Sequence, residues 1–286
     1  MSRLGQLRYR FGQFNIAEKL ILINILCFVL PFFFRTLFFL FNLPQFSWLS
    51  YFELSSDIST LVFRPWTLLS YGFFHGGIGH ILWNMLLLYY AAQIFLNLFS
   101  SQRFINVFFM GILVGGIVFI LSYALFPVFE GQTPNMVGSS AGVMAVLIFC
   151  CTYLPTQEIR LLFFNLKLMY LGIALVVLDV LQIPTGNAGG HLAHIGGAAL
   201  GYLYAMQLQQ GRDIGSGFER LWKAFASLGQ PRAKMKPVYR APKKSKTKNS
   251  LSEQEKIDRI LDKISASGYD SLTEEEKAIL FKAGKK

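Results

Sequence analysis

The sequence contains few charged residues and few cysteines. Only 15% of its 286 residues are charged and 53% are hydrophobic, and a soluble fold of this length would struggle to bury so large an apolar share. The three cysteines all lie inside apolar stretches. We therefore expect neither a disulfide framework nor a cysteine-based metal site. These absences disfavour an ordinary soluble protein and favour a membrane protein.

The charges that are present lie mostly toward the C-terminal end. Residues 1–210 contain nine Lys and Arg against six Asp and Glu, whereas residues 211–286 contain eighteen against ten. We therefore predict three parts. They are a membrane domain over residues 1–210, a basic flexible linker over residues 211–250 and a small cytoplasmic helical hairpin over residues 251–286.

The linker and the hairpin are predicted from composition and from capping signals. Basic residues and prolines are frequent over residues 212–248, a composition that resists folding and suits an anionic membrane surface. Farther along, Ser252-x-x-Glu255 and Thr273-x-x-Glu276 have the spacing of capping boxes. These signals predict two short helices in the last part of the chain.

Six apolar stretches are long enough, or nearly so, to cross a bilayer. A spanning helix needs about 20 predominantly apolar residues. The stretches are Leu20–Phe41, His80–Phe99, Phe104–Phe126, Ser139–Leu154, Leu161–Ile183 and His191–Leu208. We predict an all-α membrane protein with a bundle of six transmembrane helices, the first of which is a retained helix rather than a cleaved signal peptide.

The basic residues between the stretches predict the orientation, because Lys and Arg gather on the cytoplasmic side of a membrane. The N-terminal segment, the connections around Arg103 and Arg160 and the C-terminal tail are basic, whereas the intervening segments contain one basic residue, Arg64. Both termini are therefore expected in the cytoplasm, in an integral protein of the cell (inner) membrane. The outer segment Asn42–Gly79 is apolar and aromatic, so we expect it in the membrane interface.

The four histidines form two pairs at the outer ends of the second and sixth helices. His80 and Asn84 are four residues apart, so their side chains share one helix face. Polar groups near the hydrocarbon mark either a functional site or hydrogen bonding between helices, and this pair alone leaves both open. His75 precedes the second apolar run and His191 is the first residue of the sixth, so both are more typical of interfacial anchoring or loop hydrogen bonding.

The fourth apolar stretch is short and begins with polar residues. Its roughly 16 residues give about 24 Å of helix, so Ser139 and Ser140 are expected below the outer surface in a water-filled pocket. Free amides at a helix N-terminus favour negative charge, which is what the oxyanion of an acyl transfer presents. Ser140 is therefore a candidate nucleophile.

The sixth stretch contains a candidate base. His194 is followed by Gly197 and Gly201, whose spacing lets another helix approach closely, and the fourth helix offers matching small residues. Such packing would bring Ser140 and His194 to one depth. A nucleophile, a base and two donors at one level are what acyl transfer needs.

Three motifs together resemble those of the rhomboid family of intramembrane serine proteases. They are His75-x4-His80-x3-Asn84, Gly138-x-Ser140 and Ala193-His194-x2-Gly197-x3-Gly201, in this order on the second, fourth and sixth helices. The resemblance covers about residues 63–210 by motif and leaves the tail outside it.

The resemblance implies a serine endopeptidase that cleaves membrane proteins in or near their spanning helix, at the outer side. Ser140 would attack the peptide carbonyl, and His194 would act as the general base and then as the general acid. The oxyanion would be bound by His80, Asn84 and the backbone amide of Ser140. Structural roles near the site fall to His75, Gly138, Gly197 and Gly201. The implied partners are single-span substrates and membrane lipids, with no nucleic acid, metal or cofactor.

The chain departs from the family pattern at three positions. Thr67 follows Trp66 where many members have Arg, Ala141 follows the nucleophile where Gly is usual, and Met144 stands where an aromatic side chain often stacks on the histidine. A methionine sulfur can still contact an imidazole. We therefore expect altered positioning of His194 or altered specificity rather than loss of activity.

Other interpretations fit less well. The main alternative is an inactive rhomboid-like protein that binds membrane helices, although such relatives usually lack the serine or the histidine. Gly138-x-Ser140-x-Gly142 also matches the nucleophile elbow of an α/β-hydrolase, but a polar loop precedes it instead of a buried strand. Scattered intramembrane polar residues disfavour a transporter. Asp179 is expected to tether helices as a hydrogen-bond acceptor rather than to complete a triad.

Overall fold

Helices make up most of the chain. The computed structural model describes residues 3–44, 47–161, 164–227 and 253–284. The chain divides into two compact units, Met1–Gln230 and Pro231–Lys286, and each is described by itself.

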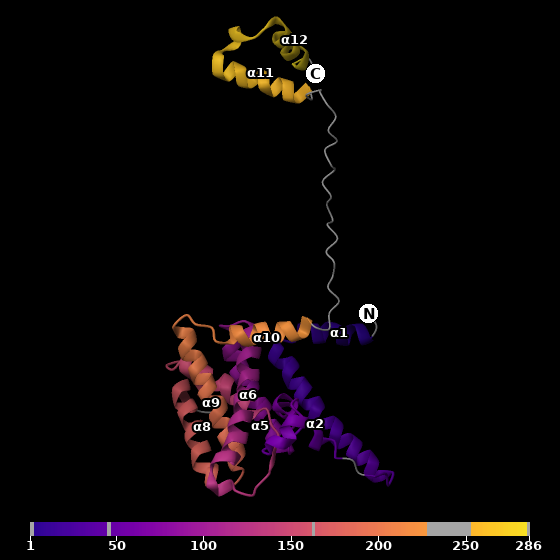
Figure 1. Ribbon diagram of the computed structural model, residues 1–286, viewed down its shortest axis with the longest axis vertical. Coiled ribbons are helices and arrows are strands. Elements are labelled where there is room, and N and C mark those ends of the chain that lie inside the picture. The colour runs from indigo at the N-terminus through magenta and orange to yellow at the C-terminus, as the bar shows by residue number, and fades with distance from the viewer. Residues whose placement is uncertain (1–2, 45–46, 162–163, 228–252, 285–286) are drawn as a thin grey trace. The chain divides into compact units, whose positions relative to one another are not determined.

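The first unit is built on six helices, one for each apolar stretch (Figure 1). They are α2 (Ile16–Leu40), α5 (Ile78–Leu96), α6 (Ser101–Leu125), α7 (Ser140–Tyr153), α8 (Leu168–Gln182) and α9 (Ala188–Gln209). Among the described residues, α2, α5, α6 and α8 with the turn after it are long and apolar enough to cross a membrane. The predicted helical membrane fold is therefore confirmed, and six crossings stay a prediction.

Helix α7 is the most enclosed of the six. Every residue from Ala141 to Cys151 is buried, and α7 contacts α5, α6, α8 and α9. A helix that is apolar all round has no face for solvent, so it is stable only when other helices surround it. The start of α7, where Ser140 lies, is thereby held from several sides.

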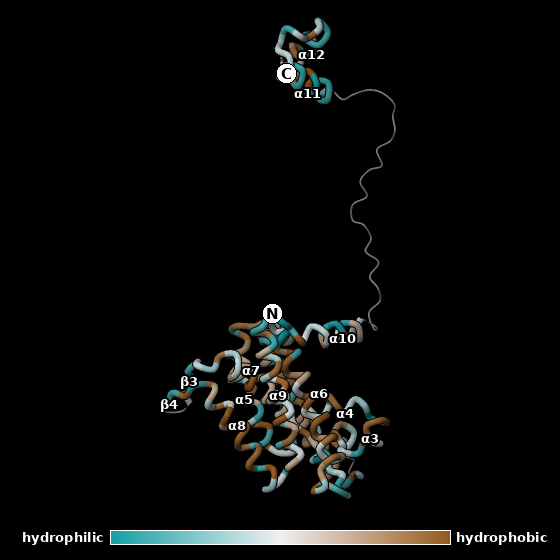
Figure 2. Tube along the Cα trace, turned by 60° about the vertical axis from the view of Figure 1, so that its left-hand side comes forward, coloured by the Kyte–Doolittle hydropathy of each residue, from teal (hydrophilic) through white to brown (hydrophobic). Residues whose placement is uncertain are grey.

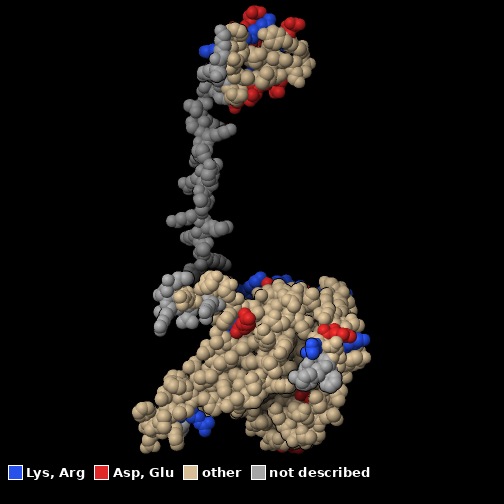
Figure 3. All heavy atoms as spheres, turned by 180° about the vertical axis from the view of Figure 1, so that it is seen from behind, with Lys and Arg blue, Asp and Glu red and all other residues tan. Residues whose placement is uncertain are grey.

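Large apolar side chains cover the outside of this unit. Phe33 on α2, Leu121 on α6 and Leu178 on α8 are each about half exposed or more. Figure 2 shows mainly hydrophobic colour along α6 and α8, and in Figure 3 charged side chains are sparse over the flanks. So much exposed apolar surface is typical of a protein embedded in lipid.

The fifth stretch begins its helix later than predicted. In place of helix from Leu161, β3 (Glu158–Leu161) pairs antiparallel with β4 (Phe164–Lys167), and α8 begins at Leu168. Both strands alternate polar and apolar residues, which is the period of a strand and not of a helix. Our prediction overlooked this alternation inside an apolar run.

The segment between α2 and α5 folds into short elements. They are η1 (Leu49–Tyr51), β1 (Leu54–Ser55), α3 (Ile58–Phe63), α4 (Thr67–Ser70) and η2 (Tyr71–Phe73). After η3 (Pro127–Phe129), β2 (Asn135–Met136) pairs antiparallel with β1. This pairing ties the segment to the residues that lead into α7. A last short turn, η4 (Ile183–Thr185), connects α8 with α9.

Two helices, α1 (Arg3–Gln13) and α10 (Gly215–Ser227), lie across one end of the bundle (Figure 1). Asp213 joins three elements there: it receives hydrogen bonds from Arg103 on α6 and from Tyr204 on α9, and it also caps Gly215. Residues 211–250 were predicted as a flexible linker, and α10 corrects its first part. The helix forms because apolar residues at helical spacing, such as Trp222 stacked on Phe109, give it a packing face.

The second unit contains α11 (Glu253–Ser267), η5 (Tyr269–Ser271) and α12 (Glu274–Ala283). The capping box predicted at Thr273 is present, since its side chain and that of Glu276 each bond the other's backbone amide. Lys263 on α11 pairs with Glu276 at 2.8 Å. The other predicted box includes Ser252, which lies outside the described residues.

Candidate active site

The nucleophile predicted at Ser140 is the first residue of α7, directly after a sharp turn. Gly138 has φ +136°, a conformation that side chains rarely adopt, and its amide donates to the Tyr71 carbonyl at 3.0 Å. A Cβ added to Gly138 would lie 2.9 Å from Nε2 of His80 and 3.5 Å from Oγ of Ser140. The His80 ring and the serine hydroxyl therefore both lie close to Gly138, where a side chain would not fit.

His75 contacts this turn through the side chain of Ser139. It is buried, and its Nε2 lies 3.2 Å from Oγ of Ser139, the residue before the predicted nucleophile. The rings of His75 and His80 are 5.1 Å apart in an edge-to-face arrangement. His75 thus contacts Ser139, which precedes the predicted nucleophile, and His80, a predicted oxyanion donor. The structural role of His75 stays a prediction.

Asn84 lies one turn below His80 on α5. Its side-chain nitrogen donates to the His80 carbonyl at 2.9 Å, within the same helix. This bond occupies one of the two N–H groups of the amide and leaves the other for a ligand. The predicted oxyanion donors His80 and Asn84 therefore do share a face of α5, as their spacing requires.

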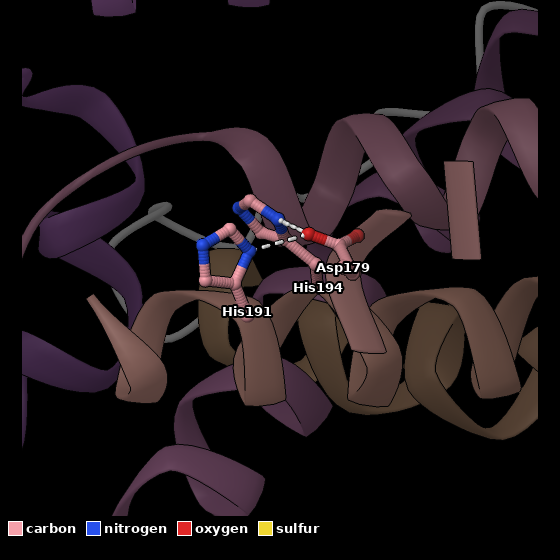
Figure 4. Close-up of side chains that lie close together, drawn as sticks. All are labelled: Asp179, His191 and His194. Carbon is pink, nitrogen blue, oxygen red and sulfur yellow. Dashed lines mark hydrogen bonds and ion pairs between the residues drawn. The ribbon is translucent and has the colours of Figure 1, made fainter. Parts of the chain in front are cut away.

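His194 belongs to a cluster of three side chains that join α8 to α9 (Figure 4). Oδ1 of Asp179 lies 2.8 Å from Nδ1 of His194 and 2.7 Å from Nδ1 of His191. An ionised carboxylate only accepts hydrogen bonds, so both imidazoles donate from Nδ1. In its neutral form His194 then has an unprotonated Nε2, which is the atom that a general base uses.

Close helix packing brings the ends of α7 and α9 together. A Cβ on Gly197 would overlap the Ala141 carbonyl, and one on Gly201 would overlap that of Ala145. On the opposite side, a Cβ on Gly115 of α6 would meet both Ala141 and Ala193. Ala141 and Ala193 directly adjoin Ser140 and His194 in the chain. His194 bonds Asp179 through Nδ1, and among the described residues no hydrogen bond joins it to Ser140.

Residues 62–210, about half of the chain, match the family model of the Rhomboid domain. The chain belongs to the rhomboid family. Residues 245–286 match a second model, described as a family of unknown function (DUF6576). The rhomboid chain is an integral membrane protein, since its family agrees with the four span-length apolar helices found among the described residues.

Proteins named as rhomboid-like are similar to about half of this chain. RHOMBOID-like protein 12, mitochondrial, of Arabidopsis thaliana is 30% identical over 162 residues, which cover 52% of this chain and 48% of that protein. Presenilin-associated rhomboid-like protein A, mitochondrial, of Danio rerio is 26% identical over 155 residues, or 53% and 37% of the two chains. The human Presenilin-associated rhomboid-like protein, mitochondrial, is 25% identical, with 53% and 38% covered. This chain therefore matches less than half the length of these relatives.

The three departures from the rhomboid pattern all have packing roles. Thr67 is buried and its hydroxyl donates to the Arg64 carbonyl at 2.7 Å. Ala141 is 1% exposed against Gly115, and Met144 packs in a cluster with Ile148 and Ala198. Met144 thus fills space between helices one turn below the site.

Sequence reasoning underrated Asp179 in the rhomboid domain. We expected a tether between helices, and the carboxylate is one, but it also binds the predicted base. The available signal was its location three residues before the end of α8, close in the chain to the start of α9. Sequence spacing alone does not show which way a side chain on another helix faces.

The same three groups have the spacing of a candidate metal site. Their ligand atoms all lie within 4.8 Å of one another. However, both imidazole nitrogens are within 2.8 Å of one carboxylate oxygen, which is hydrogen-bond distance. Two ligands of one zinc ion, each about 2.1 Å from it in tetrahedral geometry, sit farther apart than that. The arrangement therefore fits a hydrogen-bonded cluster better than a metal centre.

Proposed function

We propose that this rhomboid protein is an intramembrane serine endopeptidase that cleaves membrane proteins in or near their spanning helix. The observation that carries the proposal is the orientation of His194. Its Nδ1 is bound by Asp179 and its Nε2 is left as a base. The close approach of Gly197 on α9 to the Ala141 backbone on α7 supports a location of His194 near Ser140. A nucleophile, a base and an orienting group in one place support acyl transfer.

In the proposed reaction, Oγ of Ser140 attacks the peptide carbonyl while Nε2 of His194 accepts its proton. His80, Asn84 and the backbone amide of Ser140 bind the resulting oxyanion. His194 then gives the proton to the leaving amine, and the acyl-enzyme is hydrolysed by water that His194 activates. Asp179 acts on His194, since its negative charge stabilises the imidazolium and its oxygen fixes the tautomer.

We further propose that all six helices cross the membrane, with both termini in the cytoplasm and the site open to the outer side. The short α7 supports this depth, because a helix of 14 residues spans only about 21 Å and leaves its start below one surface. The three predicted parts of the chain and its lipid and single-span protein partners belong to the same proposal. The relatives are named mitochondrial proteins, whereas a cell inner membrane is our proposal for this chain.

The test is cleavage of a single-span reporter protein in liposomes. Wild type should cut the reporter, while Ser140→Ala and His194→Ala should both fall to the uncatalysed background. Ser101→Ala, an exposed serine at the start of α6, serves as the matched control and should cut like wild type.

Labelling with a fluorophosphonate probe completes the experiment. Cleavage by all variants would refute the assignment of Ser140 and His194. No cleavage by any variant, with no labelling of wild type, would refute protease function and support an inactive protein that binds membrane helices.

A further inference from the structure

A cavity of about 430 Å³ lies between α2 and the segment that precedes α5. Its lining combines an aromatic and aliphatic wall with two opposite charges. The lining residues are Cys27, Phe28, Pro31, Phe32, Arg35, Ser47, Trp48, Leu49, Glu53, Phe74 and His75. Of these residues, only His75 contacts the turn at Gly138 that precedes Ser140, which we call the catalytic turn. The cavity is therefore distinct from the proposed active site.

Arg35 is the positive group of this cavity. It lies in the apolar helix α2, and among the described residues it makes no hydrogen bond or ion pair. A cation in a membrane helix is costly unless it reaches an anion or the interface. Five residues before the end of α2, it is placed at the level of lipid headgroups. A phosphate is the anion that a guanidinium binds best there.

Glu53 is the negative group. It is half-buried, and its Oε2 accepts a hydrogen bond from Nδ2 of Asn135 at 3.0 Å. This contact leaves its other oxygen, Oε1, without a partner among the described residues. A carboxylate oxygen in such a place fits a donor with a positive charge, such as a primary ammonium group.

The apolar wall runs along α2 from the charged end toward the membrane interior. Cys27 lies eight residues before Arg35, so the two are separated by about 12 Å of helix. Phe28 and Phe32 lie between them on the same wall. An acyl chain that starts at the level of Arg35 would follow this surface into the hydrocarbon.

We propose that the cavity binds a zwitterionic phospholipid with a primary amine, that is, a phosphatidylethanolamine. Its phosphate pairs with Arg35, its ammonium with Glu53, and one acyl chain lies along Phe28 and Phe32. Choline lacks an N–H for Glu53, and a purely anionic headgroup would meet that carboxylate unfavourably. The charge pattern therefore selects one headgroup.

The binding test uses the fluorescence of Trp48, which lines the cavity. The other tryptophans, Trp66, Trp83 and Trp222, are replaced by Phe, and the protein is placed in phosphatidylcholine vesicles. Each sample contains one tenth of brominated phosphatidylethanolamine, phosphatidylcholine or phosphatidylglycerol. Brominated phosphatidylethanolamine should quench Trp48 at least twofold more than the other two.

Two substitutions and their controls locate the effect. Arg35→Leu and Glu53→Gln should each reduce the excess quenching to the level of brominated phosphatidylcholine. Lys19→Leu, at the other end of α2, and Glu130→Gln, in another outer segment, remove the same charges and should leave it unchanged. Equal quenching by all three lipids, or strongest quenching by phosphatidylglycerol or phosphatidylcholine, would overturn the proposal.

The cavity also contacts the proposed catalytic turn by two routes. His75 connects its lining to Ser139, and Glu53 precedes β1, which pairs with β2 just before that turn. Resting on the proposed protease function, we expect phosphatidylethanolamine to raise cleavage severalfold in wild type and not in Arg35→Leu. Selective quenching with no cleavage would contradict the protease alone, whereas cleavage without selective quenching would contradict the lipid site alone.

Discussion

Two interfaces of the bundle differ sharply in how closely the helices meet. Between α7 and α9, glycines bring one backbone against the other, so that no Cβ fits at Gly197 or Gly201. Around α2 the packing is open: only 11% of its span is buried, against 56% for α6, and a cavity of about 430 Å³ adjoins it. The α7–α9 interface, which positions the proposed active site, is therefore built from small residues that fix the helices closely. The surroundings of α2 leave space for lipid instead.

Outside the proposed catalytic residues, the largest expected effect on activity comes from filling the tight interface between α7 and α9. Gly197→Ala adds a Cβ where the Ala141 carbonyl lies, so α9 must shift away from α7. Overpacking of this kind costs about 1–3 kcal/mol of stability, and a shift of about 1 Å at a site reduces activity on the order of 100-fold. Thermal unfolding in detergent and reporter cleavage measure the two effects.

Gly217→Ala is the matched control for this substitution. Gly217 lies in helix α10, and a Cβ there would meet nothing within 4 Å. Gly217→Ala should leave the stability of the protein unchanged or raise it by up to about 1 kcal/mol. Equal effects at Gly197 and Gly217 would contradict the idea that backbone contact holds the site.

The next largest effect is expected in the hydrogen-bonded cluster that joins Asp179 to His191 and His194. Asp179→Ala removes the acceptor for Nδ1 of His194, and we expect kcat to fall about 10–100-fold with little change in KM. Asp179→Asn retains a carbonyl oxygen that can accept the same bond, so it should recover part of the loss. The measurement is the pH profile of kcat for both variants. Identical losses with unchanged pH profiles would mean that Asp179 only joins the helices.

A smaller effect is expected at the end of the bundle where α10 packs. Burial disfavours the ionised form of Asp213, but hydrogen bonds from Tyr204 and Arg103 outweigh it and hold the pKa of this carboxyl below its usual value. A carboxyl whose pKa is lowered by folding stabilises the fold at pH values above its pKa in the unfolded chain, about 4. This stabilisation is lost as the pH falls through the lowered pKa of the folded protein.

Asp213→Asn should therefore cost about 1 kcal/mol at pH 7, allowing for partial exposure, and progressively less in acid. Unfolding of both proteins between pH 7 and pH 3 checks this. A difference that stays constant over this range would argue against an ionic contribution of Asp213.

The smallest effect is expected on the open side. Phe33 on α2 is 54% exposed, so Phe33→Ala should change stability by less than about 0.5 kcal/mol. Phe149 on α7 is fully buried, and Phe149→Ala should cost about 3–5 kcal/mol. Thermal unfolding compares the two. A large loss at Phe33 would show that α2 packs more tightly than its exposure indicates.

The sequence predicted the helices better than it predicted their contacts. Apolar length located all six helices, and the polar residues at their starts singled out Ser140 and His194 before any contact was known. It failed at Leu161, where a strand pair replaces the start of α8, because a mixed apolar run hides its period. It also failed at α10, because a basic composition masked an amphipathic helix.

What the sequence determined by itself is local: apolar length makes a membrane helix, a glycine allows a turn or a close approach, and spacing puts His80 and Asn84 on one face. The tertiary structure decided which side chains on different helices contact each other. Asp179 bonds His194, and Arg35 lines a cavity with Glu53, because helices separated in the chain are oriented by packing. A repeat within one helix contains no information about the rotation of its neighbour.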